Sequence, residues 1–203
     1  RYPSKTVTEL VVGIGRDSRI SGPDLTKEFI QVLLAFGVRV IDFEMATTPS
    51  MFMATQFEEF NCDATVMFTA SHLPFYYNGL KFFTREGGLE SSDIRDIIAL
   101  VDEKEELPQE PVSTIEIKSI FERYSHHLVD LIRKGSGSEK EKPLEGLHII
   151  VDAGNGAGGF YAEKVLEVLG ANTQGSQFLD PDGTFPNHIP NPDNKEAMES
   201  IKN

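Results

Sequence analysis

The sequence of 203 residues has a single cysteine, Cys62, and no apolar run long enough to cross a bilayer. One cysteine excludes an internal disulfide and any zinc site built from several cysteines. A chain without disulfides or a membrane span is typical of an intracellular, cytoplasmic protein, and no membrane partner is expected. The chain also lacks an initiator methionine, so we expect the natural N-terminus, with any targeting segment, to lie upstream of Arg1.

Basic residues are scarce relative to acidic ones. The chain carries 19 Lys and Arg against 32 Asp and Glu, a formal net charge of −13. Such a field repels polyanions on average, so we expect no nucleic-acid partner. A small phosphorylated ligand remains compatible with this charge, because a local cluster of donors can override the average field.

Strand-like and helix-like segments alternate in the first part of the chain. Short apolar runs predict buried strands, and two segments with Pro near their starts predict helices between them: strands 10–14, 38–43 and 64–68, helices opening at Ser21 and Thr47. This order predicts right-handed crossovers and a mainly parallel, mixed sheet within a three-layer α/β/α sandwich. A short strand over 80–83 and helices over 92–101 and 115–133 are expected to follow.

The polar stretch 135–143 contains no apolar residue to bury and predicts a linker. We therefore expect a first domain over 1–134 and a partial second domain over 144–203. In the second domain the strand–helix order begins again, with a strand over 147–151, a helix over 158–169 and a strand over 172–178. This unit buries too little apolar surface to stand alone, so we expect it to be the start of a second, similar domain.

Ser71 follows the carboxyl end of the predicted strand 64–68, which is where ligands bind in open α/β sheets. A serine in this place can act as a nucleophile or carry a phosphoryl group. A phosphoserine brings a charge of roughly −1.5 to −2 that cations must balance, and His72 and Lys81 are the nearby candidates. Lys81 could also move a proton if the fold buries it. The alternative interpretation is a polar loop in which Ser71 caps a turn.

The segment Thr69-Ala70-Ser71-His72-Leu73-Pro74, followed by Asn78-Gly79-Leu80-Lys81, resembles the phosphoserine loop of the α-D-phosphohexomutases. The resemblance implies that Ser71 is the phosphorylated serine, that Lys81 is a general acid or base, that His72 is the loop histidine of the catalytic site, and that Asn78 contacts substrate or phosphate. Leu73 stands where the family has Asn, and Leu cannot donate the hydrogen bonds that Asn can.

Further segments carry the same resemblance in the family's order. Gly15-Arg16-Asp17-Ser18-Arg19 is similar to the family's Gly-Arg-Asp-x-Arg motif, which makes Arg16 and Arg19 candidates for substrate or phosphate binding. The alternative is a solvated turn in which Asp17 pairs with an arginine, and we expect the role of this motif to be mainly structural. The segments 151–158 and 181–192 are similar to the start of the family's second domain and to its following loop.

The resemblance implies an intramolecular phosphotransferase that interconverts sugar 1-phosphate and sugar 6-phosphate. Hexose phosphate and hexose bisphosphate would be its partners, with Ser71 as the phosphoryl carrier. It also implies Mg²⁺, held by three aspartates of an Asp-Gly-Asp-Gly-Asp-Arg loop and by a phosphoryl oxygen on Ser71. That loop is absent from the sequence, so we expect this chain to be an incomplete, inactive fragment of a larger enzyme.

Three other functions stay open at the level of sequence. Gly154-x-Gly156-x-x-Gly159, with Asp180 further on, fits a dinucleotide-binding fingerprint. A serine hydrolase would use Ser71 as its nucleophile, although no Gly-x-Ser-x-Gly elbow surrounds it. A non-catalytic relative that binds phosphosugars would explain Leu73.

Overall fold

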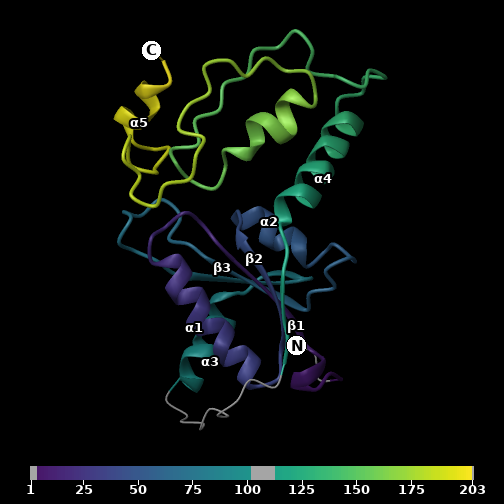
Figure 1. Ribbon diagram of the computed structural model, residues 1–203, viewed down its shortest axis with the longest axis vertical. Helices are drawn as coiled ribbons and strands as arrows, with labels where there is room; N and C mark the ends of the chain where they lie inside the picture. The colour runs from purple at the N-terminus through teal and green to yellow at the C-terminus, as the bar shows by residue number, and fades with distance from the viewer. Residues whose placement is uncertain (1–3, 102–112, 203) are drawn as a thin grey trace. The chain divides into compact units, whose positions relative to one another are not determined.

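The computed structural model describes residues 4–101 and 113–202, which form two compact units (Figure 1). The first unit comprises Arg1–Arg16, Ser21–Thr69 and Gly79–Lys118. The second comprises Asp17–Ile20, Ala70–Asn78 and Ser119–Asn203. Two short loops of the N-terminal half therefore belong to the second unit.

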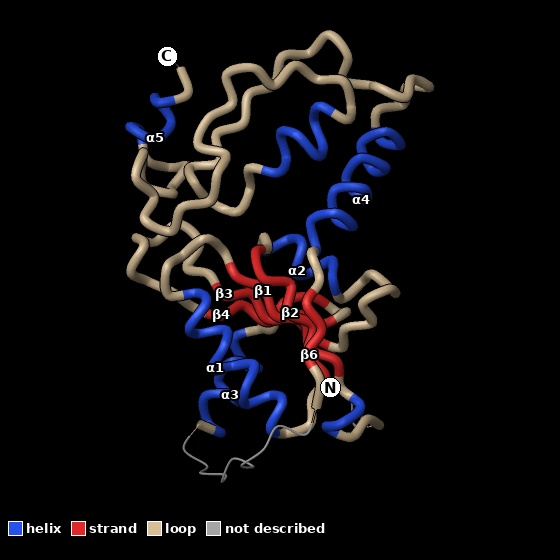
Figure 2. The backbone as a smooth tube through the Cα atoms, in the orientation of Figure 1, coloured by secondary structure: helices blue, strands red, loops and turns tan. Residues whose placement is uncertain are grey.

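The first unit is built on a six-stranded sheet with strand order β5-β4-β3-β1-β2-β6 (Figure 2). The strands are β1 (Val11–Arg16), β2 (Arg39–Met45), β3 (Ala64–Phe68), β4 (Leu80–Thr84), β5 (Gly87–Gly88) and β6 (Ile115–Ile117). β3, β1, β2 and β6 are parallel, while β4 and β5 pair antiparallel at one edge. The predicted mixed, mainly parallel sheet is confirmed.

Helices cover both faces of this sheet. α1 (Gly22–Ala35) and α3 (Ser91–Leu100) lie on one side, and α2 (Thr48–Ala54) lies on the other (Figure 2). A short 3₁₀ turn, η1 (Val7–Glu9), precedes β1. One buried cluster joins α1 to the sheet, through Ile14, Ile30, Val40, Val66 and Phe68. The three-layer α/β/α sandwich predicted from the alternating segments is therefore confirmed.

The opposite face of β1 presents glycine to α2. A Cβ at Gly15 would lie 2.5 Å from the Met51 sulfur and 2.8 Å from the Ala46 Cβ. Met51 is fully buried, so it packs directly on the β1 backbone, and Gly15 makes that approach possible. Since neighbouring residues of a strand face opposite sides, Ile14 then faces α1.

The second unit contains α4 (Ile120–Gly135), the π-helical segment η2 (Ala162–Glu167) and α5 (Lys195–Ser200). Val129 of α4 packs with Val165 and Leu169 in a buried cluster. The rings of Phe121 and Phe160 stack at 4.4 Å beside it. Within residues 4–101 and 113–202, no helix has the length and apolarity that crossing a membrane requires.

The helix predicted over 115–133 is wrong in its first residues. Ile115–Ile117 form the edge strand β6, parallel to β2, and α4 begins at Ile120. The alternation Ile-Glu-Ile is typical of a strand, but the prediction assigned these three residues to the first turn of the helix. Because α4 packs on η2, the second unit begins at Ser119, and the predicted linker 135–143 lies inside that unit.

The two strands predicted in the second unit are present only as an interrupted parallel pairing. Isolated bridges join His148 to Asn172 and Asp152 to Gln177. Between them the Ser176 N–H donates to the Thr173 carbonyl, and the Ser176 hydroxyl accepts a hydrogen bond from the Val151 N–H. A side chain thus replaces the carbonyl that a regular ladder would supply. The predicted helix over 158–169 is present over 160–167, where Ala162–Glu167 form the π-helical η2.

We predict that Gly15→Ala destabilises the first unit by about 1–3 kcal/mol, because the added methyl overlaps Met51 and Ala46. Gly88→Ala is the matched control, since its methyl would come no closer than 3.8 Å to any neighbour. Urea unfolding of both variants measures the difference. Equal unfolding midpoints for the two variants would contradict the packing described here.

Candidate functional site

Ser71 lies in the connection between β3 and β4, called here the serine loop (residues 69–79). The Thr69 N–H donates to the Gly79 carbonyl at 2.9 Å and closes the base of the loop. Two turns follow each other inside it, with Leu73 N–H on the Ala70 carbonyl and Tyr77 N–H on the Pro74 carbonyl, both at 3.0 Å. The serine therefore sits in a strand–loop–strand connection. A hydrolase nucleophile elbow needs a strand-to-helix turn, so the local structure disfavours that alternative.

The sheet order places the serine loop at a topological switch point. From β1 the chain passes through α1 to β2 on one side, then through α2 to β3 on the other side of β1. Arg16 at the end of β1 is in register with Phe68 at the end of β3. The loops that follow these strands, 17–20 and 70–78, therefore leave the sheet from adjacent carboxyl ends. This is the usual place for ligands in open α/β sheets.

Ser71 is exposed and adopts the left-handed region, with φ of 53°. A residue other than glycine is uncommon there, and the conformation persists only where surrounding contacts hold it. His72, the next residue, is also exposed. The loop therefore presents a serine side chain to solvent on a constrained backbone.

Arg19 supplies the contacts that hold the serine loop. Its guanidinium is fully buried and donates to three loop carbonyls: Nη2 to Ser71 at 2.9 Å, and Nη1 to Pro74 at 2.7 Å and Tyr77 at 3.1 Å. Nε donates to the Asp17 carboxylate at 3.0 Å. Four of the five guanidinium N–H groups are thus paired, and Asp17 balances a charge that would otherwise be costly to bury.

The prediction that Arg19 binds substrate phosphate stays a prediction, and the geometry gives this residue a structural role. Its side chain is covered and its donors are directed at backbone carbonyls, so its role is to shape the loop. The pairing of Asp17 with an arginine is present, but Arg19 is buried, so the turn is not the solvated one that was expected.

The other predicted site residues are divided between the two units. Asn78 is half-buried and lies with Ser71, His72 and Arg19 in the second unit, whereas Arg16 and Lys81 belong to the first. Arg16 is half-buried, packs its carbon chain against Gly22 and lines a cavity of about 220 Å³ with Lys27, Gln31 and Asp42 among others. Lys81 is exposed.

Two residues that received no role from sequence also contact Arg19. Gly183 forms an isolated parallel bridge with Arg19, and the Phe185 ring lies 5.4 Å from the guanidinium carbon. Nothing in the spacing of the chain links these residues to Arg19. The only signal was that the segment 181–192 is similar to a loop of the same family.

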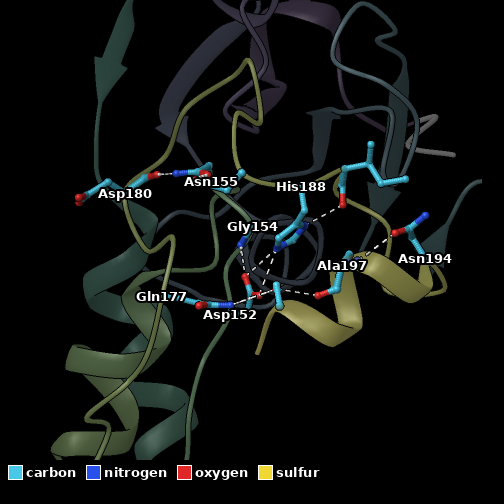
Figure 3. A network of polar contacts seen from close by, with 11 residues as sticks. Asp152, Gly154, Asn155, Gln177, Asp180, His188, Asn194 and Ala197 are labelled. Carbon is cyan, nitrogen blue, oxygen red and sulfur yellow. Dashed lines mark hydrogen bonds and ion pairs between the residues drawn. The ribbon is translucent and has the colours of Figure 1, made fainter. Parts of the chain in front are cut away.

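A second polar cluster of the second unit centres on Asp152 (Figure 3). Its carboxylate accepts from the Gly154 N–H and from Gln177 Nε2, both at 2.9 Å, from the Ser200 hydroxyl at 3.2 Å, and from His188 Nε2 at 3.1 Å. The other ring nitrogen, Nδ1 of His188, lies 2.9 Å from the Ile189 carbonyl. A carbonyl and a carboxylate both accept, so this arrangement favours the protonated imidazole, which donates from both nitrogens.

The pKa values of this pair agree with that geometry. Burial alone lowers the pKa of His188, but the hydrogen bonds to the Ile189 carbonyl and to Asp152 outweigh it and raise the pKa overall. Burial alone raises the pKa of Asp152, but the hydrogen bonds from Gln177, His188 and Gly154 lower it overall. The pair is therefore ionised together over a window that includes weakly acidic pH.

The glycines of the possible dinucleotide fingerprint serve internal packing. A Cβ at Gly159 would lie 1.9 Å from the Leu179 carbonyl oxygen, and one at Gly154 would lie 2.9 Å from the His188 ring. Asp180, the candidate ribose-binding acid, accepts a hydrogen bond from Asn155 through its backbone carbonyl. These two glycines therefore serve internal packing, and Gly154 also lines a cavity of about 340 Å³ with Asp152 and His188 among others.

No set of three His, Cys, Asp or Glu side chains converges to hold a metal ion anywhere in the described ranges. The carboxylate described beside the serine loop is Asp17, and it is paired with Arg19. The donor set of the site residues named above does not by itself fit a Mg²⁺ ion, which requires several oxygen ligands.

The fold and the loop together define an α/β domain whose switch point carries an exposed serine. The chain belongs to the phosphoglucomutase/phosphomannomutase family: the model of its α/β/α domain I matches residues 2–108, and that of its α/β/α domain II matches residues 122–203.

Curated phosphoglucomutases and phosphomannomutases are similar in sequence to nearly the whole of this chain. A phosphoglucomutase of Neisseria gonorrhoeae is 32% identical over 191 residues, covering 94% of this chain and 39% of the relative. A phosphomannomutase/phosphoglucomutase of Pseudomonas aeruginosa strain PAO1 is 34% identical, with coverage of 95% and 39%. The chain thus spans about two fifths of the length of these curated relatives.

Solved structures show the same fold. A phosphoglucomutase/phosphomannomutase family protein from Burkholderia thailandensis has a TM-score of 0.78 at 29% identity, covering 95% of this chain and 41% of that one. The open form of the Paramecium phosphoglucomutase parafusin has a TM-score of 0.72 at 19% identity, with coverage of 96% and 40%. The latter likeness concerns the fold alone.

We predict that Arg19→Lys loosens the serine loop, because one ammonium cannot reach three carbonyls and a carboxylate at once. The loss is about 1–3 kcal/mol of local stability, equivalent to a roughly fivefold to 150-fold increase in opening. Amide hydrogen exchange over residues 70–78 of the full-length protein measures it, with the exposed Arg95→Lys as the control. Unchanged exchange in Arg19→Lys would show that the guanidinium does not hold the loop.

The Asp152–His188 pair predicts a defined pH dependence. The raised pKa of His188 contributes stability below its unfolded value, near 6.5, which is lost as pH rises through the folded pKa. The lowered pKa of Asp152 contributes stability above its unfolded value, about 3.8. That stability is lost as pH falls through the folded pKa. The urea midpoint of His188→Gln should therefore differ most from wild type near pH 5–6 and less at pH 9. His126→Gln, at an exposed position, is the control, and a pH-independent difference for His188→Gln would refute the ion pair.

Proposed function

We propose that this chain is the phosphoryl-carrying part of a phosphohexose mutase, with Ser71 as the carrier. The observation behind the proposal is an exposed serine in a left-handed backbone conformation, on a switch-point loop whose carbonyls are held by a buried arginine. The names of the relatives support sugar phosphates as the substrate class. Since the chain spans 39% of those relatives, the complete reaction requires the remainder of the protein.

The proposed step moves one phosphoryl group in each direction. Ser71 Oγ forms a bond to phosphorus of a hexose bisphosphate, and the bond from that phosphorus to the sugar oxygen breaks. The serine hydroxyl loses its proton, and the sugar oxygen gains one. The reverse step returns the phosphoryl group to a sugar monophosphate at its other position, so 1-phosphate and 6-phosphate interconvert through the bisphosphate.

Ser71 suits this role because the protein constrains its backbone before the reaction. Phosphoryl transfer depends largely on positioning and on charge stabilisation. A short side chain on a held loop limits the positions that the attacking oxygen can take. We assign the proton transfers to Lys81 and His72, and the substrate contacts to Asn78 and Arg16, as the sequence resemblance implies.

Magnesium enters the proposal only as a partner of phosphorylated Ser71. Mg²⁺ bound there would neutralise charge on the phosphoryl group, with the group on Ser71 as one oxygen ligand. The described residues offer no carboxylate cluster to complete such a site. We propose that its remaining ligands come from the rest of the full-length protein, as the sequence resemblance implies.

Leu73 favours a second candidate function. It is 51% exposed on the serine loop, at the position where the sequence resemblance places an Asn. A relative that binds phosphosugars without turning them over would tolerate this loss of a hydrogen-bond donor. Mutase assays of the full-length protein with glucose, mannose and glucosamine phosphates decide between the two, because a binding protein shows affinity without turnover.

We predict that Ser71→Ala abolishes both mutase activity and covalent phosphate uptake from glucose 1,6-bisphosphate in the full-length protein, because the accepting oxygen is gone. Intact mass and peptide mapping measure the added phosphate. Ser92→Ala is the matched control, since Ser92 is an exposed serine of α3. Phosphate uptake that persists in Ser71→Ala, or that maps to another residue in wild type, would remove Ser71 from its proposed role.

A further inference from the structure

We propose that Gly183 and Phe185 are positioning residues for the phosphoryl-carrying serine and act on it through Arg19. The inference rests on the proposed function of Ser71 and adds to it a specific role for a distant segment of the chain. That segment, the 180–187 loop, lies in the same compact unit as the serine loop.

Gly183 brings the backbone of the 180–187 loop against the backbone around Arg19. The two residues form a parallel bridge, and a Cβ at Gly183 would lie 2.2 Å from the Ser18 carbonyl oxygen and 2.7 Å from the Ile20 nitrogen. Both neighbours are main-chain atoms, which cannot turn aside as a flexible side chain can. Glycine is therefore required for this approach, which fixes the backbone from which the Arg19 side chain extends.

Phe185 contacts the guanidinium of Arg19. Its ring centroid lies 5.4 Å from the guanidinium carbon, within the range of a cation–π contact. Phe185 itself adopts φ of 50°, a left-handed conformation that is unfavourable for an aromatic residue. The Phe185 N–H bonds to the Asp182 carbonyl at 3.0 Å, and this turn helps to hold the ring where the arginine lies.

The 180–187 loop is itself anchored by Asn155. The buried Asn155 donates from its side chain to the Asp180 carbonyl at 2.9 Å (Figure 3), and its carbonyl accepts the Asp182 N–H at 2.8 Å. The Asn187 side chain donates to the Asn155 side-chain oxygen at 2.7 Å. The loop that contacts Arg19 is thus fixed at both of its ends by one residue.

These contacts form a continuous path of packed and hydrogen-bonded groups. It runs from Asn155 to Gly183 and Phe185, then through Arg19 to the Ser71 carbonyl. A displacement at Gly183 must therefore shift the guanidinium that holds the serine loop. Since misplacing a reacting group by about 1 Å can cost about a hundredfold in rate, this displacement should slow phosphoryl transfer.

The test uses the full-length protein, phosphorylated with glucose 1,6-bisphosphate, and measures the single-turnover rate constant for transfer to glucose 1-phosphate. A smaller folded fraction lowers the amplitude of that transfer and leaves its rate constant unchanged. We expect Gly183→Ala to lower the rate constant about tenfold to a hundredfold, with KM changed less than about threefold. Gly135→Ala is the matched control, because its methyl would meet nothing within 4 Å.

A substitution at Phe185 provides a second variant, which changes a side chain and leaves the close backbone approach at Gly183 intact. Phe185→Leu should lower the rate constant several-fold because it removes the ring from the guanidinium, and Phe185→Tyr should restore it. An unchanged rate constant in Phe185→Leu overturns the inference, whether or not Gly183→Ala folds. A raised KM with an unchanged rate constant also overturns it, because that indicates substrate binding. Wild type that takes up no phosphate on Ser71 refutes the proposed function instead.

Discussion

The buried guanidinium of Arg19 is the interaction on which the serine loop depends. A planar fork of N–H donors can satisfy three carbonyls and a carboxylate at once, which an ammonium on a flexible stem cannot do. Burying this charge is favourable only because Asp17 balances it and because four N–H groups are paired. The left-handed backbone of Ser71 is maintained by the same contacts.

The sheet explains why this interaction can form at all. Loops from β1 and β3 leave adjacent carboxyl ends because the strand order reverses at β1. Arg19 lies on the first of these loops and Ser71 on the second, so a side chain of ordinary length can bridge them. Within the first unit, Gly15 and Met51 set the spacing between one face of the sheet and α2.

Sequence reasoning succeeded where one local rule determined the outcome. The apolar run 64–68 predicted β3 to the residue, and the helix expected over 92–101 is α3, Ser91–Leu100. It failed where tertiary contacts decided the outcome. Ile115–Ile117 joined β2 as an edge strand, and the Ser176 hydroxyl interrupted an expected strand pairing.

The candidate site shows the same division between residues that a local pattern identifies and residues that depend on tertiary contacts. Ser71 could be singled out because it follows a buried strand and sits in a motif. The burial of Arg19 could not be predicted, because Ser18 and Ile20 flank it without a pattern that distinguishes a buried arginine from a solvated one. The contacts from Gly183 and Phe185 depend on residues far apart in the chain, and no spacing rule connects them.

The most direct test of the path from Gly183 to Ser71 is a double-mutant cycle between Phe185→Leu and Arg19→Lys in the full-length protein. The quantity measured is the single-turnover rate constant for phosphoryl transfer from Ser71. If Phe185 acts through Arg19, its substitution changes the rate constant in the wild-type background and has little further effect in the Arg19→Lys background. Two effects that multiply independently would contradict the account.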